Sequence, residues 1–128
     1  MRLLLDTHVW IWWLTDPDRL SRPADSALSD PDNQLYLSPV STWELMVKSA
    51  AGRVTVAGSV EALVDEAITA SGVHPLPIEH SHALLLRQLP AHHRDPFDRM
   101  LVAQAQLDGL TLVTADRQLS AYDIETLW

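Results

Sequence analysis

The sequence of 128 residues has no cysteine and a single lysine, and each shortage narrows the choice of function. Without cysteine the chain has no disulfide, no thiolate nucleophile and no cysteine ligand for zinc. Its 9 lysines and arginines face 17 aspartates and glutamates, which leaves a net charge of -8. This balance disfavours a protein that coats nucleic acid through a broad basic surface, although a single phosphate-contacting site stays possible. The acidic surface suits a basic protein partner, or it simply keeps the chain in solution.

Long apolar runs are also missing from the sequence. Asp6 and His8 interrupt the N-terminal apolar stretch, and no small-residue cleavage site follows it. We therefore expect neither a signal peptide nor a membrane span, and a protein of the cytoplasm. The chain has 47% hydrophobic residues, no internal repeat and no linker, so residues 1–128 are expected to form a single domain with a well-packed core.

Short apolar runs alternate with segments of helical period along the whole chain. The runs that predict strands are Leu3–Leu5, Leu35–Leu37, Val73–Ile78, Leu110–Val113 and Ile124–Trp128. The segments that predict helices are His8–Leu14, Ala24–Leu28, Thr42–Ala51, Val60–Ala70, Ser81–Gln88 and Pro96–Leu107. Alternation of this kind indicates an α/β sandwich with a parallel sheet that is covered by helices on both faces.

Four acidic residues fall where the strands of such a sheet end. Asp6 directly follows the first predicted strand, and Asp116 follows the strand that ends at Val113. Glu44 and Asp98 lie near the beginnings of two predicted helices. All strands of a parallel sheet end at the same edge, where ligands bind, so these four side chains can converge in one crevice.

Each of these acids also has a purely structural explanation. Asp6 precedes a predicted helix as a possible N-cap, and Asp95 does the same ahead of Pro96. Ser41 and Glu44 have the spacing of a capping box, whereas an aspartate such as Asp116 commonly holds a turn. Taken singly, each acid is better explained by structure, and only the combination favours a site.

Electrostatics indicates what such a site would need. Two carboxylates about 4 Å apart repel each other by about 4 kcal/mol at an effective dielectric constant of 20, so four of them require a cation. Oxygen ligands select Mg²⁺ or Mn²⁺, since His80, His82, His92 and His93 lack the helical spacing of a zinc site and are interpreted as surface or loop residues. Such an ion binds phosphate oxygens and activates water, which predicts phosphodiester hydrolysis.

The few basic residues cluster near these acids in the sequence. Arg94, Arg99 and Arg117 adjoin them and are candidate contacts for substrate phosphate, with ordinary surface ion pairs as the alternative. Lys48 lies four residues after Glu44, which predicts an ion pair along one helix face.

Four motifs, LLLDTH, STWE, DPFDRMLVAQA and LVTAD, occur in this order, and with them the chain resembles the PIN-domain ribonucleases. The likeness is to the VapC-type toxins of bacterial toxin–antitoxin pairs and extends from Arg2 to Trp128. It implies an α/β/α sandwich around a parallel sheet of five strands. It also implies that the metal-binding and catalytic acids, in chain order, are Asp6, Glu44, Asp98 and Asp116.

The resemblance further implies supporting residues and partners. It assigns to Thr114 a hydroxyl that orients the site, with Thr7 in a similar role, while Asp95 is close enough to join the metal shell. It implies a Mg²⁺-dependent endoribonuclease, an RNA substrate, a homodimer, and a cognate antitoxin with a basic C-terminal segment. Trp12 or Trp43 is then a candidate contact in an interface, whereas Trp10 and Trp13 share a helix face and are expected in the core.

Other functions are compatible with parts of this pattern. A metal-dependent phosphatase could use Asp6 as its nucleophile, but it usually has a second aspartate two residues later, where this chain has His8. A phosphate-accepting receiver domain needs a lysine near the end of a late strand, and the only lysine is Lys48. A catalytically silent module that binds a partner, with its acids serving only as caps, is the remaining alternative.

Overall fold

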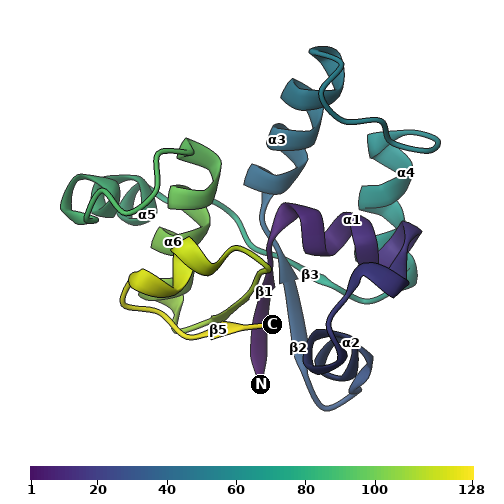
Figure 1. Cartoon of the computed structure of the whole chain (residues 1–128), viewed down its shortest axis with the longest axis horizontal. Helices are drawn as coiled ribbons and strands as arrows, with labels where there is room; N and C mark the ends of the chain where they lie inside the picture. Colours follow the sequence, from purple (N-terminus) through teal and green to yellow (C-terminus); the bar gives the residue numbers. More distant parts are fainter.

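In the computed structural model, which describes residues 1–128, five parallel strands form one sheet in the order β3-β2-β1-β4-β5 (Figure 1). The strands are β1 (Arg2–Leu5), β2 (Gln34–Leu37), β3 (His74–Pro75), β4 (Thr111–Val113) and β5 (Thr126–Leu127). β1 lies in the centre, where Leu3 is opposite Leu35 of β2 and Thr111 of β4. The predicted parallel α/β fold is confirmed.

Helices follow the strands along the chain. They are α1 (Thr7–Thr15), α2 (Arg22–Ser29), α3 (Pro39–Ala50), α4 (Val60–Asp65), α5 (His80–Leu85) and α6 (Pro96–Asp108). A π-helical turn, Glu66–Ala70, extends α4, and a 3₁₀ turn, Leu86–Gln88, extends α5. Two further 3₁₀ turns are Pro17–Arg19 and Arg117–Ala121. A lipid bilayer could not be crossed by any of these helices, given their length and polarity.

The central strand has an apolar layer on each of its faces. Leu3 and Leu5 pack into one core cluster with Trp10 of α1, together with residues of α2 and α4. Leu4 points the other way, into a second cluster that contains Leu101 of α6. Figure 1 shows α1, α2 and α4 on one side of the sheet and α5 and α6 on the other. Burial on both faces explains why β1 is continuously apolar instead of alternating with polar residues.

The beginning of α3 differs from the expected capping box. Ser38 is the N-cap, because its Oγ accepts the N–H of Val40 at 3.1 Å and Pro39 occupies the first helical position. Ser41 and Glu44 lie inside the helix and are buried, so the capping-box interpretation is wrong. The helix therefore begins three residues earlier than the sequence pattern indicated, and Glu44 is free for another role.

The third strand is also shorter than predicted. Only His74–Pro75 pairs with β2, instead of the whole run Val73–Ile78. Pro75 and Pro77 have no N–H to donate to a ladder, which limits the pairing at this edge of the sheet.

The tryptophans divide between core and surface. Trp10 is fully buried, and Trp13 packs against the same cluster, as expected for core residues. Trp12 is partly exposed and packs against Trp128, while Trp43 on α3 is 59% exposed. Trp43 is therefore the more accessible of the two candidate contacts.

The end of α6 provides a test of the fold. Gly109 has a φ of 66°, and a Cβ added there would meet nothing within 4 Å, so only its backbone conformation is demanding. We expect Gly109→Ala to lower the free energy of unfolding by about 1–2 kcal/mol. Gly109→Asn should cost less, because asparagine tolerates this conformation. Urea denaturation of both variants measures the difference, and an alanine variant as stable as the asparagine variant would contradict this account.

Candidate active site

Asp6 lies at the N-cap position of α1, yet its side chain forms no capping hydrogen bond. Instead, the hydroxyl of Thr114 donates to Asp6 Oδ2 at 2.6 Å. The other oxygen, Oδ1, is buried and has no hydrogen-bond partner. Burial raises the pKa of Asp6, and the bond from Thr114 only partly opposes this rise. Asp6 therefore presents an unpaired oxygen to the site, which is what a ligand for a cation requires.

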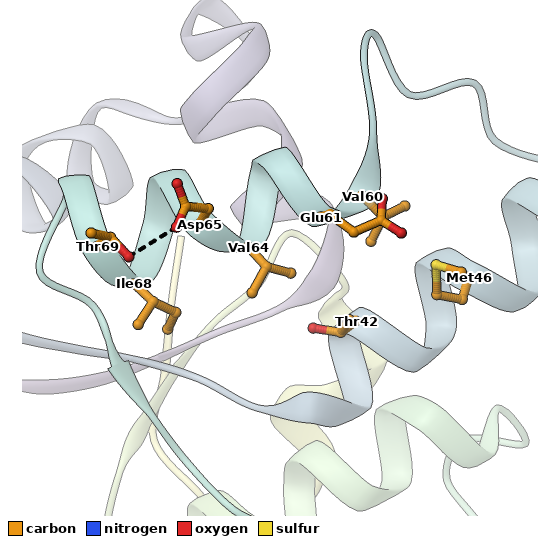
Figure 2. Close-up of a pocket in the computed structure, with 8 residues that line it drawn as sticks. All are labelled: Thr42, Met46, Val60, Glu61, Val64, Asp65, Ile68 and Thr69. Atoms are coloured by element: carbon orange, nitrogen blue, oxygen red, sulfur yellow. Dashed lines mark hydrogen bonds between the residues drawn. The ribbon is translucent and has the colours of Figure 1, made fainter.

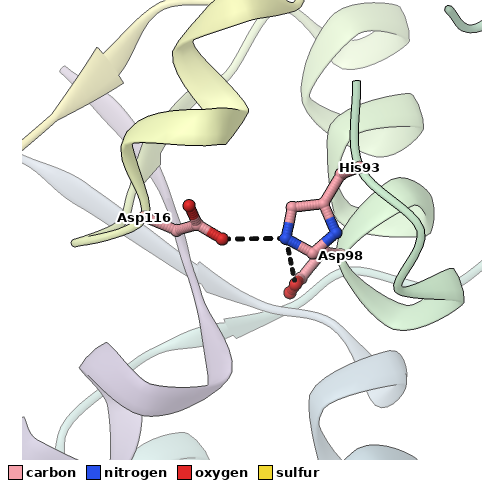
Figure 3. A group of neighbouring side chains, drawn as sticks. All are labelled: His93, Asp98 and Asp116. Carbon is pink, nitrogen blue, oxygen red and sulfur yellow. Dashed lines mark hydrogen bonds and ion pairs between the residues drawn. The ribbon is translucent and has the colours of Figure 1, made fainter. Parts of the chain in front are cut away.

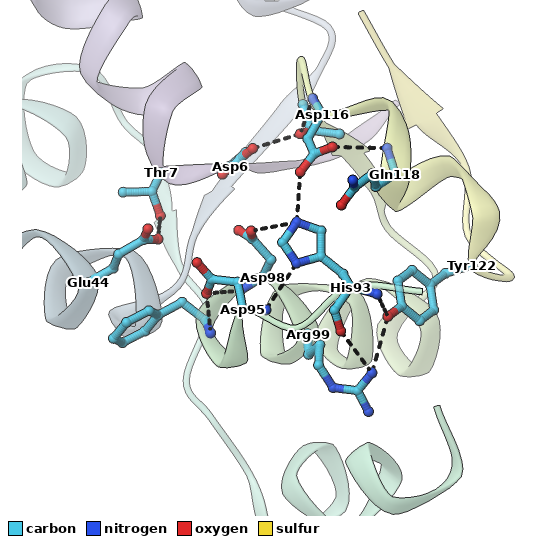
Figure 4. A network of polar contacts seen from close by, with 12 residues as sticks. Asp6, Thr7, Glu44, His93, Asp95, Asp98, Arg99, Asp116, Gln118 and Tyr122 are labelled. Carbon is cyan, nitrogen blue, oxygen red and sulfur yellow. Dashed lines mark hydrogen bonds and ion pairs between the residues drawn. The ribbon is translucent and has the colours of Figure 1, made fainter. Parts of the chain in front are cut away.

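Thr114 connects Asp6 with Asp116. The Thr114 hydroxyl accepts the backbone N–H of Asp116 at 3.1 Å while it donates to Asp6. Asp116 Oδ1 then accepts the N–H of Gln118 at 2.9 Å, so the predicted turn-holding role of Asp116 is confirmed. The second oxygen of Asp116 is left to face the site (Figure 4).

Glu44 reaches the same site from α3 and is 2% exposed. Its Oε1 accepts a hydrogen bond from Thr7 Oγ1 at 2.7 Å, and Thr7 Oγ1 also lies 2.9 Å from Ser41 Oγ. Its Oε2 pairs with Lys48, one turn further along α3, which confirms the predicted ion pair. Burial alone would lower the pKa of Lys48, but the hydrogen bond and the charge of Glu44 outweigh it and raise the pKa, so Lys48 stays charged.

Asp98 is placed by the first turn of α6. Asp95 is the N-cap, as expected, because its Oδ1 accepts the N–H of Phe97 at 2.8 Å and of Asp98 at 3.3 Å. The pKa of Asp98 is raised to about 8, first by burial and then by the charges of Asp6, Asp95, Glu44 and Asp116. This shift shows that the predicted acids, which are distant in the sequence, lie within electrostatic reach of one another.

His93 is the site residue that sequence reasoning missed. Its Nε2 lies 2.9 Å from Asp116 Oδ2 and 3.4 Å from Asp98 Oδ2 (Figure 3). His93 does lie in a loop, as expected, but its contact with the acids was not foreseen. The interpretation of the histidines as surface or loop residues is wrong for His82, which is in α5, 2% exposed and bonded to Asp108. The available signal was the position of His93 two residues before the N-cap of α6.

The three arginines have different surroundings. The guanidinium of Arg99 donates to backbone carbonyls of the chain before α6, namely Leu86 in the 3₁₀ turn and Leu89, Pro90 and His93 in the loop. The structure thus gives Arg99 a structural task in place of the predicted phosphate contact. Arg94 and Arg117 are exposed and directly follow His93 and Asp116 in the chain, so both remain candidates for the predicted phosphate contact.

The donor set fits a hard divalent cation. Single ligand atoms of His93, Asp98 and Asp116 lie within 4.8 Å of one another, and Asp6 adds its unpaired oxygen. The site has no sulfur ligand, and carboxylate oxygens suit Mg²⁺ or Mn²⁺. Residues that could hold such an ion are Asp6, Glu44, Asp98 and Asp116.

A separate groove lies between α3 and α4 (Figure 2). It has a volume of about 500 Å³ and contains none of the four acids. Met46, Val60, Val64 and Ile68 form its apolar part. The groove is therefore distinct from the acidic site, and its apolar part is suited to contact with a partner.

Comparison with known proteins agrees with this architecture. The family model of the PIN domain matches residues 3–125, so the chain belongs to the PIN-domain family. Within that family it is 34% identical over 121 residues to ribonuclease VapC22 of Mycobacterium tuberculosis, a match that covers 94% of this chain and 91% of that protein.

Solved structures share the fold. VapBC2 of Rickettsia felis, bound to a DNA fragment from its promoter, matches with a TM-score of 0.73 at 12% identity, over 98% of this chain and 97% of that chain. FitAcB of Neisseria gonorrhoeae matches with a TM-score of 0.60 at 23% identity, over 97% and 95%. The predicted PIN-like sandwich is thus confirmed.

The raised pKa of Asp98 gives a test in the absence of metal. Its folded pKa of about 8 exceeds the ordinary 3.8, so ionisation of Asp98 opposes folding, and this cost grows as the pH rises between those values. In EDTA, we expect Asp98→Asn to raise the free energy of unfolding by roughly 1–3 kcal/mol near neutral pH and to change it little at about pH 4. Urea titrations at the two pH values measure this.

Asp123→Asn is the matched control, because Asp123 is exposed and outside the site. The control should change stability within about 0.5 kcal/mol at both pH values. An Asp98→Asn variant that is less stable than the parent at neutral pH would contradict the proposed cost of ionising Asp98 among the other acids.

Proposed function

We propose that this PIN-domain protein is a metal-dependent endoribonuclease, the toxin of a type II toxin–antitoxin pair, and that it hydrolyses RNA phosphodiester bonds. The observation that carries this proposal is the convergence of Asp6, Glu44, Asp98 and Asp116 at the carboxyl edge of the sheet (Figure 4). The similarity to a ribonuclease over most of the chain supports the same conclusion.

The four acids would hold Mg²⁺ or Mn²⁺, and the bound ion would supply an activated water and charge neutralisation at the scissile phosphate. Thr114 fixes the carboxylate of Asp6, and Thr7 fixes that of Glu44. Lys48 neutralises part of the charge of Glu44. One oxygen of Asp95 caps the start of α6, and the other lies 4.0 Å from Lys48 Nζ. These contacts favour a positioning role for Asp95 over metal ligation.

The substrate would approach past Arg94 and Arg117. Both are exposed beside site residues, and guanidinium groups commonly contact the phosphate backbone of nucleic acids. Because the chain has a net charge of -8, positively charged side chains near the acids are uncommon in it and are the natural candidates for a phosphate contact. They would hold the RNA backbone without reading its bases.

The partner we propose is an antitoxin with a basic C-terminal segment. The net charge of -8 and the acidic site attract such a segment, and the groove between α3 and α4 offers apolar contact next to it. Trp43, 59% exposed on α3, is a candidate contact for this partner or for the second subunit of a homodimer.

The structure disfavours the alternative in which the acids serve only as caps. Asp6 makes no capping bond despite its N-cap position, and Glu44 lies inside α3. Burying a carboxylate costs free energy, and neither residue recovers that cost by capping a helix. A purely structural role therefore does not explain why these two acids are buried. The other alternative, a phosphatase that uses Asp6 as its nucleophile, is distinguished by the same experiment that tests for nuclease activity.

The experiment is to incubate the purified protein with total cellular RNA in Mg²⁺, Mn²⁺ or EDTA and to map the cut ends. We expect cleavage with either ion and none in EDTA. Asp6→Asn and Asp98→Asn should each lower the cleavage rate about 100-fold or more, because each removes a charged ligand. Asp123→Asn serves again as the control and should cleave normally.

Release of inorganic phosphate from small phosphate esters, with RNA left intact, would instead support the phosphatase. A protein that cleaves neither substrate but stays folded would support the silent partner-binding module.

A further inference from the structure

His93 occupies the space between two of the proposed metal ligands, and its neighbours fix how it is oriented. We propose that His93 is a positioning residue whose Nε2–H holds the carboxylate of Asp116 next to Asp98, ready for the metal ion, and that Arg99 and Tyr122 hold His93. The inference rests on the metal-dependent function proposed above. It gives His93 a role as a hydrogen-bond donor instead of a metal ligand.

The orientation of the imidazole follows from its two hydrogen bonds. The backbone N–H of Asp95 donates to His93 Nδ1 at 3.1 Å. A ring nitrogen that accepts a hydrogen bond carries no proton, so the proton of the imidazole is on Nε2. Nε2 is the atom that faces Asp116 Oδ2 at 2.9 Å and Asp98 Oδ2 at 3.4 Å. His93 therefore donates to Asp116, and the carboxylate of Asp98 lies beside the same N–H.

Direct ligation of the metal by Nε2 would require the opposite arrangement of the proton. The lone pair of Nε2 would have to be free, and the proton would move to Nδ1. The Nδ1–H would then face the N–H of Asp95, so that two donors would oppose each other at 3.1 Å. The helix start that Asp95 caps keeps this N–H in place, which makes ligation by His93 unfavourable.

Asp116 depends on this donor. One of its oxygens is held by the N–H of Gln118, but its only other side-chain partner is His93. The Asp116 side chain is 36% exposed, so without His93 its second oxygen can turn towards solvent. Loss of the donor would therefore lower the fraction of molecules whose Asp116 is directed at the site.

Tyr122 and Arg99 hold the backbone of His93 from behind (Figure 4). The N–H of His93 donates to Tyr122 Oη at 3.0 Å, and Tyr122 is 4% exposed. Arg99 Nη1 donates to the same Oη at 3.1 Å and to the carbonyl of Pro90 at 2.8 Å. One arginine on α6 thus ties the preceding loop to the fold, and its guanidinium points away from the acids.

The test compares His93→Leu with His93→Gln. Mn²⁺ binding is followed by electron paramagnetic resonance in the absence of RNA, so the readout is affinity and not activity. We expect His93→Leu to weaken Mn²⁺ binding about tenfold or more, as is usual when a group that orients a ligand is lost. His93→Gln should restore most of the affinity, because its amide can accept and donate in a similar arrangement.

Further variants separate this effect from a general loss of structure. His80→Leu is the matched control, because His80 is exposed on α5 and has no side-chain contact with the site; its Mn²⁺ affinity should equal that of the parent. Tyr122→Phe keeps the buried ring but removes the acceptor for the His93 N–H, and it should weaken Mn²⁺ binding by a smaller factor than His93→Leu. Thermal unfolding in EDTA checks that each variant is folded.

Electron spin-echo spectra of the Mn²⁺-loaded parent give an independent answer. We expect no directly coordinated imidazole nitrogen. A coordinated nitrogen signal that His93→Gln removes would overturn the positioning role, and so would a folded His93→Leu with unchanged affinity. A parent protein that binds no Mn²⁺ would overturn the proposed function itself, which is a different result from either of these.

Discussion

Repulsion among buried carboxylates is the constraint on which the rest of the site depends. Each acid except Asp98 has a close hydrogen-bond or ion-pair donor, and these donors are Thr114 for Asp6, Thr7 and Lys48 for Glu44, and His93 for Asp116. Asp98 has only the more distant contact with His93, at 3.4 Å. Burial raises the pKa of Asp98 to about 8, and the charges of the neighbouring acids add to the rise. Glu44 and Asp116 thus have a donor on each oxygen, whereas Asp6 keeps one unpaired oxygen and Asp98 has no close donor.

The fold makes such an arrangement possible by placing Asp6 at the end of its central strand, whose leucines are fully buried. Asp6 ends β1, which is buried on both faces and paired with β2 and β4. The N–H of Asp6 continues the β1–β4 ladder with a bond to the carbonyl of Val113 at 3.0 Å, and Thr114 follows at once. The Thr114–Asp6 contact is therefore set by strand register, because two adjacent parallel strands end side by side. A site on such strands keeps its geometry better than one on loops alone.

Much of this architecture could be predicted from the sequence, because the buried parallel sheet determines both the apolar pattern and the position of the acids. Strands that are buried on both faces are continuously apolar, and topology alone sends the residues after them to one edge, so Asp6 and Asp116 could be located. The start of α3 could not, because Ser38 and Ser41 both satisfy local capping rules and only the burial of Glu44 decides between them. His93 was missed because its partner, Asp116, lies 23 residues away in the chain. Contacts of that kind have no local pattern.

The hydrogen bonds also determine which carboxylate oxygens a cation could contact without displacing a donor. Both oxygens of Glu44 are engaged, one by Thr7 and one by Lys48, so a cation that contacts Glu44 must displace a donor. Asp6 Oδ1 has no donor to displace, and the carboxylate of Asp98 accepts no short hydrogen bond. Pairing with a divalent ion returns to these two acids the stabilisation that burial removed from them. Asp6 and Asp98 are thus the acids at which an ion would displace no close donor, whereas contact with Glu44 would displace Thr7 or Lys48.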